Sequence, residues 1–261
     1  MILFIFFLIC FGASAIGAIC GIGGGVIIKP VLDAFHMMDV AAISFLSGCT
    51  VLSMTAYSVV RGKLGKESHV DQKTGLPLAL GAACGGLAGT WLFSCISAFS
   101  PDKKRVGAVQ AFCLMLVTAG TVIYTLYKSR ITTRKVTAPA ACVLIGSALG
   151  IMSSFLGIGG GPVNLVVLFF FFSMNTKTAA ENSLYIIFFS QLTSLLSTVF
   201  TGSIPDIDLP VLFVMVIGGI AGGICGRALN KKISDKAVDK LFIALMFVII
   251  VICIYNMVTY I

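Results

Sequence analysis

The chain has 261 residues, of which 58% are hydrophobic and only 11% are charged, and its formal net charge is +8. Soluble domains carry about 25% charged residues, so this chain has too little polar surface to coat a water-soluble globule. A soluble fold is therefore excluded, and the mean hydropathy of +1.07 indicates an all-α polytopic membrane protein.

The first half of the chain contains five apolar segments. Only helices and closed barrels satisfy their backbone groups in lipid, and no segment alternates with a period of two residues. The first segment lacks the basic residues that open a signal peptide, so we interpret it as a retained span. The second is short, because 14 residues of helix reach only about 21 Å. Helices are expected at 1–20, 25–38, 40–60, 75–99 and 106–127.

The second half repeats this pattern, with helices expected at 137–156, 161–174, 179–200, 209–229 and 239–260. The run Gly21–Gly25 (GIGGG) recurs letter for letter as Gly157–Gly161, at an offset of 136 residues. The glycines of 81–89 recur in 218–226, and Asp102-Lys103 recurs as Asp235-Lys236. Three landmarks in the same order predict two homologous repeats, 1–130 and 131–261, within one integral membrane domain.

The positions of Lys and Arg predict how often each half crosses the membrane. An even number of crossings would place eight of the Lys and Arg residues in the loops on one face and nine on the other. An odd number places fourteen on one face, in 61–73, 128–135, Lys177 and 227–240, and leaves three on the other, in 103–105. Cytoplasmic loops are rich in Lys and Arg, so the odd number is favoured. The two repeats are then inverted, with both termini outside, and each has five crossings or three crossings and a re-entrant hairpin.

Each Gly triplet separates two apolar helices and frees the backbone to leave helical geometry. In lipid such a break is tolerated only where it is buried in protein or lines a cavity, so two equivalent breaks predict one shared site. The helices that begin at Val26 and Pro162 would direct unpaired N–H groups and positive dipole ends at this site, which is suited to an anion. Glycines also permit close helix packing, and we expect that role for those in 81–89 and 218–226.

The duplicated GIGGG motif with a short apolar helix after each copy, the small size and the two-half layout resemble the TauE/SafE family of sulfite and organosulfonate exporters. The resemblance covers essentially the whole chain. It implies carriage of a small, often sulfur-containing oxyanion across the cytoplasmic membrane. The first copy keeps the proline that is frequent after the triplet, Pro30, but has Lys29 where an apolar residue is usual. The second has Pro162 and Asn164, with Val166 where another proline is frequent.

Polar side chains within the apolar segments complete the candidate site. Lys29 would either hold the anion or snorkel to the cytoplasmic interface, since a charge at bilayer depth costs roughly 3 kcal/mol. Asparagine amides and serine hydroxyls can donate hydrogen bonds to an oxyanion or link helices to each other. The candidate substrate-binding residues are Gly23, Gly24, Gly25, Lys29, Ser47, Gly159, Gly160, Gly161, Asn164, Asn182 and Ser183.

Glu181 is the one carboxylate at the entrance of an otherwise uncharged segment, so it is the candidate for a coupling proton. The simpler role is that of an acidic residue at a helix N-terminus. Enzymatic chemistry is not indicated, because His36 and His69 lie apart and neither a nucleophile–base pair nor a metal-ligand spacing is present. The nine Cys residues include no Cys-x-x-Cys pair and predict neither a zinc site nor a disulfide framework, and no cofactor is expected.

We interpret the chain as a secondary transporter of the cell membrane, which moves a small oxyanion by alternating access with H⁺ or Na⁺ as a possible coupling ion. A passive anion channel and an uptake carrier for another small carboxylate or oxyanion are the alternatives, and a membrane scaffold without transport is a third class. Nucleic-acid binding is not indicated, because the Lys and Arg residues lie between apolar blocks rather than on one basic face. The oligomeric state is open.

Overall fold

The structure is a computed structural model that describes residues 2–35, 38–64, 70, 72–99 and 103–260; His36 and His69 lie outside the described residues. In these ranges every long element is an α-helix and no strand is present. The helices are α1 Ile2–Cys20, α2 Gly25–Ala34, α3 Val40–Leu64, α4 Gln72–Phe99, α5 Lys103–Tyr127, α6 Pro139–Leu156, α7 Pro162–Phe172, α8 Thr176–Phe200, α9 Leu209–Lys232 and α10 Asp235–Tyr260. A short 3₁₀ turn at Lys128–Arg130 follows α5. The all-helical fold class is confirmed.

Eight of the helices are long and apolar enough to cross a membrane. The other two, α2 and α7, have 10 and 11 residues and so reach only about 15 and 17 Å. Large apolar side chains such as Phe4, Trp91, Phe213 and Val251 are exposed on the outside of the bundle. Such a surface suits lipid, and the chain is a multi-pass membrane protein.

Local sequence explains where the helices around the second glycine run end and begin. α6 ends at Leu156 because Gly157 takes a left-handed conformation with φ of +63°. α7 begins at Pro162, where a missing N–H costs nothing. The Asn175 side chain caps α8 by accepting a hydrogen bond of 2.8 Å from the Thr178 amide.

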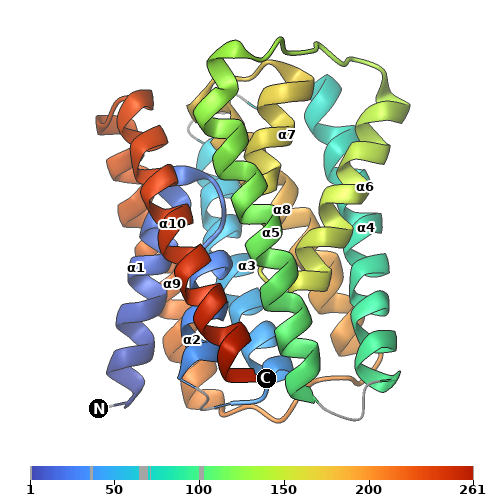
Figure 1. Ribbon diagram of the computed structural model, residues 1–261, viewed down its shortest axis with the longest axis vertical. Helices are drawn as coiled ribbons and strands as arrows, with labels where there is room; N and C mark the ends of the chain where they lie inside the picture. Colours follow the sequence, from blue (N-terminus) through green and yellow to red (C-terminus); the bar gives the residue numbers. More distant parts are fainter. Residues whose placement is uncertain (1, 36–37, 65–69, 71, 100–102, 261) are drawn as a thin grey trace.

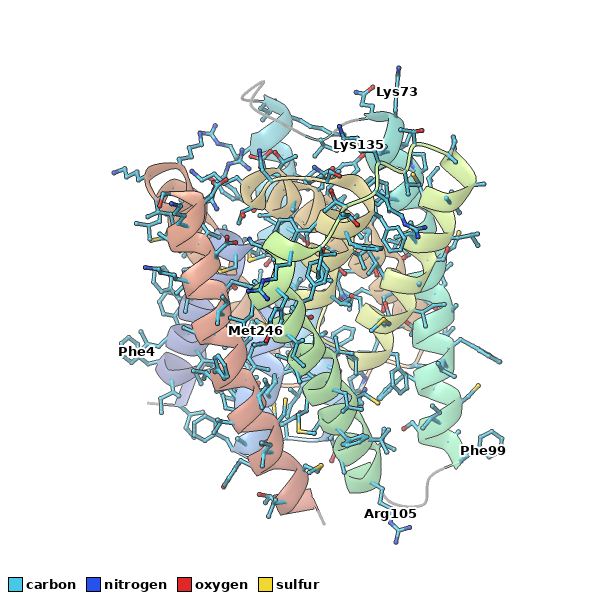
Figure 2. The ribbon with its side chains drawn as sticks, turned by 45° about the horizontal axis from the view of Figure 1, so that its top comes forward. Phe4, Lys73, Phe99, Arg105, Lys135 and Met246 are labelled. Atoms are coloured by element: carbon cyan, nitrogen blue, oxygen red, sulfur yellow. The ribbon has the colours of Figure 1, made fainter. Side chains whose placement is uncertain are left out.

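Both chain termini lie at the same end of the molecule (Figure 1). Lys73 and Lys135 lie together at one end, and Phe99 and Arg105 lie at the other (Figure 2). The connection between the halves, which carries Lys135, is therefore at the end opposite to the termini, so each half passes through the molecule an odd number of times. The shortness of α2 and α7 favours three crossings and a re-entrant hairpin in each half.

The main contacts between helices occur in matching pairs: a contact between two helices has a counterpart between the two helices equivalent to them. α4 packs on α6 as α9 packs on α1, and α4 contacts α8 as α9 contacts α3. In the same way, α2 packs on α10 and α7 packs on α5. Two further contacts, α3 with α8 and α5 with α10, each join a helix to the equivalent helix of the other half. A two-fold axis between inverted repeats would produce this pattern, and the pattern supports that prediction.

The glycines of 81–89 and 218–226 pack helix against helix, as expected. A Cβ atom on Gly81 or Gly85 would overlap a backbone carbonyl of α6, and one on Gly222 or Gly226 would overlap a carbonyl of α1. The two stripes are equivalent in the halves and meet equivalent partners. Close backbone approach of this kind is a common reason for small residues between membrane helices.

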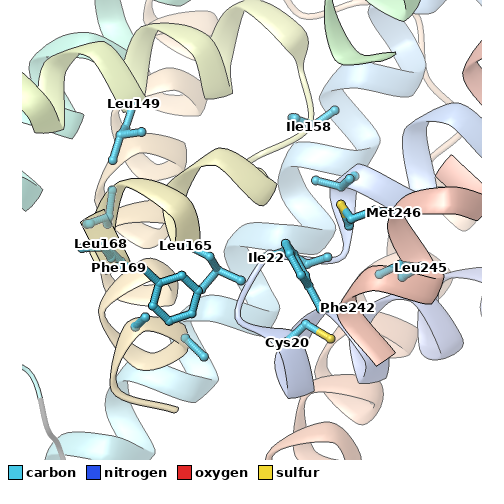
Figure 3. Close-up of a cluster of buried hydrophobic side chains, with 14 of the residues drawn as sticks. Cys20, Ile22, Leu149, Ile158, Leu165, Leu168, Phe169, Phe242, Leu245 and Met246 are labelled. Atoms are coloured by element: carbon cyan, nitrogen blue, oxygen red, sulfur yellow. The ribbon is translucent and has the colours of Figure 1, made fainter. Parts of the chain in front are cut away.

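The largest hydrophobic cluster surrounds the two glycine runs. It includes Ile22 and Ile158 of these runs together with Leu165 and Phe169 of α7 and Met246 of α10 (Figure 3). Both runs are thus buried inside the protein, which is the environment that non-helical backbone requires at membrane depth.

Candidate functional site

The two glycine runs, Gly21–Gly25 and Gly157–Gly161, lie directly against each other, and we call these ten residues the glycine crossing. A Cβ atom on Gly25 would overlap the carbonyl group of Ile158. A Cβ atom on Gly160 would lie 3.2 Å from the carbonyl oxygen of Ile22. The two breaks therefore meet through their backbones, as two symmetry-related breaks with one shared site require.

Backbone conformation explains why glycine is needed in the crossing. Gly21 and Gly157 have φ of +74° and +63°, and Gly23 and Gly159 have φ of +75° and +67°. These left-handed values are costly for residues with a Cβ atom. These two positions take the same conformation in both runs, whereas the fourth position differs, with φ of −70° at Gly24 and +143° at Gly160.

The two short helices both begin at the crossing, with α2 starting at Gly25 and α7 at Pro162. The first amides of a helix have no acceptor within it. Within the described residues, six amides before or at these starts donate to no backbone carbonyl: those of Gly23, Gly24, Gly25, Gly159, Gly160 and Gly161. The crossing therefore gathers two positive helix ends and a set of available donors, which is favourable for an anion.

Buried hydroxyl groups surround the crossing. Ser47 Oγ would lie 3.0 Å from a Cβ atom on Gly25. Ser47 and its equivalent Ser183 are both fully buried, and their hydroxyls make no hydrogen bond within the described part of the chain. Asn164 is 2% exposed and lines, with Ser153 and Gly161, a cavity of about 10 Å³. Such a cavity holds about one water molecule, so the crossing is closely packed in this structure.

An apolar pair closes the crossing on the side of the long helices. Val51 of α3 and Ile187 of α8 are equivalent at the offset of 136 residues, and both are fully buried. A Cβ atom on Gly159 would lie 2.8 Å from Val51 Cγ1, and one on Gly23 would lie 3.5 Å from Ile187 Cδ1. These side chains belong to a cluster of their own, with Met54 and Leu184.

A cavity of about 520 Å³ opens at the Lys-rich end, between α3, α4, α8 and α9. We call it the basic vestibule, because Lys63 and Arg227 line it together with Glu181. Arg227 Nη1 donates a hydrogen bond of 2.8 Å to the Ser58 carbonyl oxygen, and Lys63 Nζ lies 5.6 Å from the centre of the Tyr185 ring. Two cations at an entrance of this size would attract small anions.

A second cavity of about 100 Å³, the opposite cavity, approaches the crossing from the other end. It is lined by Thr90, Gln191 and Ser194, and it reaches Gly157 of the crossing. Thr90 Oγ1 and Ser194 Oγ lie 2.6 Å apart, within hydrogen-bonding distance. The opposite cavity thus reaches the crossing itself, whereas the basic vestibule ends at Leu184, which packs with Val51 and Ile187.

The comparison with protein families agrees with this arrangement. The model of the family described as "Sulfite exporter TauE/SafE" matches residues 6–252. The chain belongs to the TauE/SafE family. The TauE/SafE chain is also similar to the "Probable membrane transporter protein YunE" of Bacillus subtilis (strain 168), with 24% identity over 209 residues that cover 74% of this chain and 76% of the relative. No solved structure matches it significantly.

Lys29 of this TauE/SafE chain is 2% exposed and does not reach the interface. Its Nζ atom donates hydrogen bonds to Gln110 Oε1, at 2.6 Å, and to the Leu156 carbonyl oxygen, at 2.7 Å. Leu156 is the last residue of α6, directly before the second glycine run. The ammonium group therefore lies at the edge of the crossing, beside the carbonyl end of a helix.

The other two polar candidates lie closer to the basic end. Asn182 Nδ2 donates a hydrogen bond of 2.9 Å to the carbonyl oxygen of Thr178 in the same helix, and its Oδ1 would lie 3.5 Å from a Cβ atom on Gly75 of α4. Glu181 is half-buried and lines the basic vestibule. The structure thus brings the glycines, Ser47, Asn164 and Lys29 to the crossing and places Glu181 in its approach.

Three residues that line the vestibule or contact Lys29 were not among the candidates predicted from the sequence. From the sequence, Lys63 and Arg227 indicated only which face of the membrane their loops lie on, whereas in the structure both line the vestibule. The contact of Gln110 with Lys29 could not be predicted, because the two residues are 81 positions apart in the chain. An uncharged amide near the start of the apolar segment 106–127 was the available signal for Gln110.

Proposed function

We propose that the chain is a secondary transporter that carries a small, sulfur-containing oxyanion of the sulfite, sulfonate or thiosulfate class across the cytoplasmic membrane. Carriage of sulfur oxyanions is the property of its family, and the narrower choice of substrate is part of the proposal. The basic end would face the cytoplasm, with both termini outside, because Lys and Arg gather on that side.

The glycine crossing carries this proposal. Two helix starts with available amides meet buried hydroxyls at one place, and the Lys29 ammonium group lies at its edge. Neutral donors also permit release, which a carrier requires. The proposed binding residues are Gly23, Gly24, Gly25, Lys29, Ser47, Gly159, Gly160, Gly161, Asn164, Asn182 and Ser183.

The proposed mechanism is alternating access between the two repeats, 1–130 and 131–261. The basic vestibule is wide and the opposite cavity is narrow, although they share several equivalent positions. A motion that exchanges the conformations of the repeats would exchange the two openings and expose the crossing to the other end. The packed centre, with Val51 and Ile187, argues against a continuously open pore.

Flux assays in proteoliposomes test the proposal. Gly161 has extended backbone, with φ of −176°, and a Cβ atom there would touch only Ile158 Cδ1, at 3.4 Å. Gly161→Ala should therefore fold normally but place a methyl group at the start of α7, and we expect a loss of flux of about tenfold or more, which corresponds to about 1.4 kcal/mol. Gly120→Ala is the matched control, because nothing lies within 4 Å of its added Cβ atom.

Saturable flux of thiosulfate, sulfite or a sulfonate by the wild-type protein and by Gly120→Ala, with its loss in Gly161→Ala, would support the proposal. Flux that never saturates would identify a passive channel. Flux of small carboxylates alone would identify an uptake carrier of another class. Unimpaired flux in Gly161→Ala would remove the crossing from the mechanism.

A further inference from the structure

The buried ammonium group of Lys29 ties the two glycine breaks together. Lys29 belongs to the short helix that begins at the first break, and its two acceptors are Gln110 Oε1 and the carbonyl oxygen of Leu156, which ends the helix before the second break. A Cβ atom on Gly157 would lie 3.0 Å from Lys29 Nζ. Gln110 in turn donates through Nε2 to the Phe155 carbonyl oxygen, at 2.6 Å. The Lys29 ammonium group thus lies where the two halves meet.

A carboxyl group shares this environment. Asp33 lies one turn after Lys29 on α2, is 5% exposed, and acts electrostatically on Lys29. Both side chains line a cavity of about 10 Å³, together with Gln110 of α5, Leu156 of α6 and Asn256 of α10. That volume suits about one water molecule. Asn256 is 1% exposed and donates through Nδ2 to the Pro30 carbonyl oxygen, while its Oδ1 accepts no hydrogen bond within the described residues.

The charged groups around this cavity are few. Cys253 of α10 is the other titratable side chain that lines it, and it too acts electrostatically on Lys29. Among the described residues, α5 and α6 contribute no ionisable side chain to the lining, and α1 and α3 contribute no side chain at all. Lys29 and Asp33 are therefore the two side chains of opposite formal charge among the described residues that line this cavity.

The other half shows that the fold does not need this pair. At the offset of 136 residues, Lys29 corresponds to Leu165 and Asp33 to Phe169, and both of these lie in the main hydrophobic cluster (Figure 3). The equivalent hairpin thus packs with apolar side chains at both of these positions. Buried charges are costly in a membrane and commonly mark ion pathways, so the charged version calls for a functional reason.

We propose that Asp33 and Lys29 are the proton-coupling site of the transporter, in which a proton taken up by the Asp33 carboxylate leaves the Lys29 charge free to attract the substrate anion. This inference rests on the proposed function and deepens it. One O–H bond forms on Asp33, the proton coming from solution at the loading side and returning to solution at the release side. The pair is neutral before uptake and carries +1 after it. Proton and anion then favour each other's binding, which is the coupling that a symporter requires.

Asp33→Asn tests the proposal, because asparagine has the size of a protonated aspartate and cannot release a proton. In the wild type, a gradient of one pH unit should drive about tenfold accumulation of the anion on the alkaline side, for one proton per anion. Asp33→Asn should retain exchange of labelled anion across the liposome membrane, with no dependence on pH, and should lose the driven accumulation. Lys29→Gln, which keeps a hydrogen-bond donor, should lower both exchange and accumulation by about tenfold or more.

Phe169→Leu at the equivalent position of the other half is the matched control and should keep the wild-type pH dependence. Glu181→Gln separates the two candidate proton sites and should also keep it. Melting temperatures in detergent check the fold. If Asp33→Asn does not fold, calorimetry of wild-type protein with thiosulfate in buffers of different ionisation enthalpy should still show about one proton taken up per anion bound.

The possible failures are distinguishable. Accumulation that persists in Asp33→Asn, or that is lost only in Glu181→Gln, would overturn the assignment of the proton site. Accumulation driven by Na⁺ with no effect of pH would overturn it as well, while leaving the proposed function intact. Absence of flux of any anion under any gradient would overturn the proposed function itself.

Discussion

The basic vestibule and the opposite cavity share several equivalent positions, but they differ in both size and charge. At offsets of 136 or 137 residues, Lys63 corresponds to Val199, Glu181 to Phe45 and Arg227 to Thr90. Arg227 donates a hydrogen bond to the Ser58 carbonyl oxygen. At the other end, Thr90 Oγ1 lies 2.6 Å from the hydroxyl oxygen of Ser194, which is the counterpart of Ser58. The helices thus keep one arrangement at both ends, while the side chains adapt each end to its own task.

The difference in size has a separate meaning from the difference in charge. Charge is fixed by the sequence, so the basic end attracts anions in every conformation. Volume depends on how the helices are placed, and about 520 Å³ at one end against about 100 Å³ at the other describes one state of the protein. A transporter of inverted repeats would reverse the volumes during its cycle and keep the charges.

Reagent accessibility gives the largest expected effect. Val59 lines the basic vestibule, and its equivalent Leu195 lines the opposite cavity. If the state seen here is populated about 99:1, Val59→Cys should react with a membrane-impermeant thiol reagent about a hundredfold faster than Leu195→Cys. The reagent is applied from the end at which each cavity opens. Peptide mass spectrometry measures the labelling rate of each introduced cysteine separately from that of the native cysteines. Equal rates would mean that the difference in volume is not a property of the resting protein.

The glycine stripes give the next largest effect, and here the two halves should behave alike. A Cβ atom on Gly85 would overlap the Ser147 carbonyl group, and one on Gly222 would overlap that of Phe11. Overpacking of this kind costs typically about 1–3 kcal/mol, so Gly85→Ala and Gly222→Ala should lower the melting temperature by similar amounts. Gly120→Ala, with open space around the added methyl group, should change it little. A loss in only one stripe would show that the repeats are not equivalent in packing.

Much of the fold could be predicted from the sequence, because its signals are local. The helices begin and end within a few residues of the expected positions, since long uncharged segments and glycine runs mark them directly. The meeting of the two glycine runs was predictable too, because an identical motif in two halves implies symmetry-related places. The packing role of the glycines in 81–89 and 218–226 is confirmed by their contacts with α6 and α1.

The sequence could not provide the contacts that depend on how helices from both halves come together. Lys29 finds Gln110 on α5 and Leu156 at the end of α6, at separations of 81 and 127 residues. The sequence alone allowed two roles for Lys29, binding the anion or reaching the membrane interface. It indicated neither Gln110 nor Leu156 as a partner. Arg227 lies in the last part of an apolar helix, where a basic residue is usual, so its place in the vestibule becomes visible only when α3 packs beside α9.

Arg227 is also the residue with which the difference in charge can be tested. Removing its charge should weaken the capture of anions at the basic end only, because its counterpart Thr90 is neutral. Hydrogen bonds to charged groups contribute about 1.5–3 kcal/mol, so Arg227→Gln should raise the KM for flux from the basic side by about tenfold or more. Thr90→Val is the matched control and should leave that KM unchanged. Added salt should reduce the wild-type advantage, and an equal rise of KM from both sides would contradict a role at one entrance.

The ion pair between Lys128 and Asp239 should have the smallest effect, although it joins the two halves at the basic end. Lys128 Nζ lies 2.5 Å from Asp239 Oδ2, and Thr176 Oγ1 donates to Asp239 Oδ1 at 3.1 Å. Both charged side chains are about a quarter exposed, at 30% and 24%, so water and salt screen the pair. Asp239→Asn should therefore lower the stability by less than about 1 kcal/mol and keep the KM of wild type, as measured by melting temperature and flux. A large loss of flux at unchanged stability would instead show that this contact between the turn after α5 and α10 takes part in transport, although neither residue lines the vestibule.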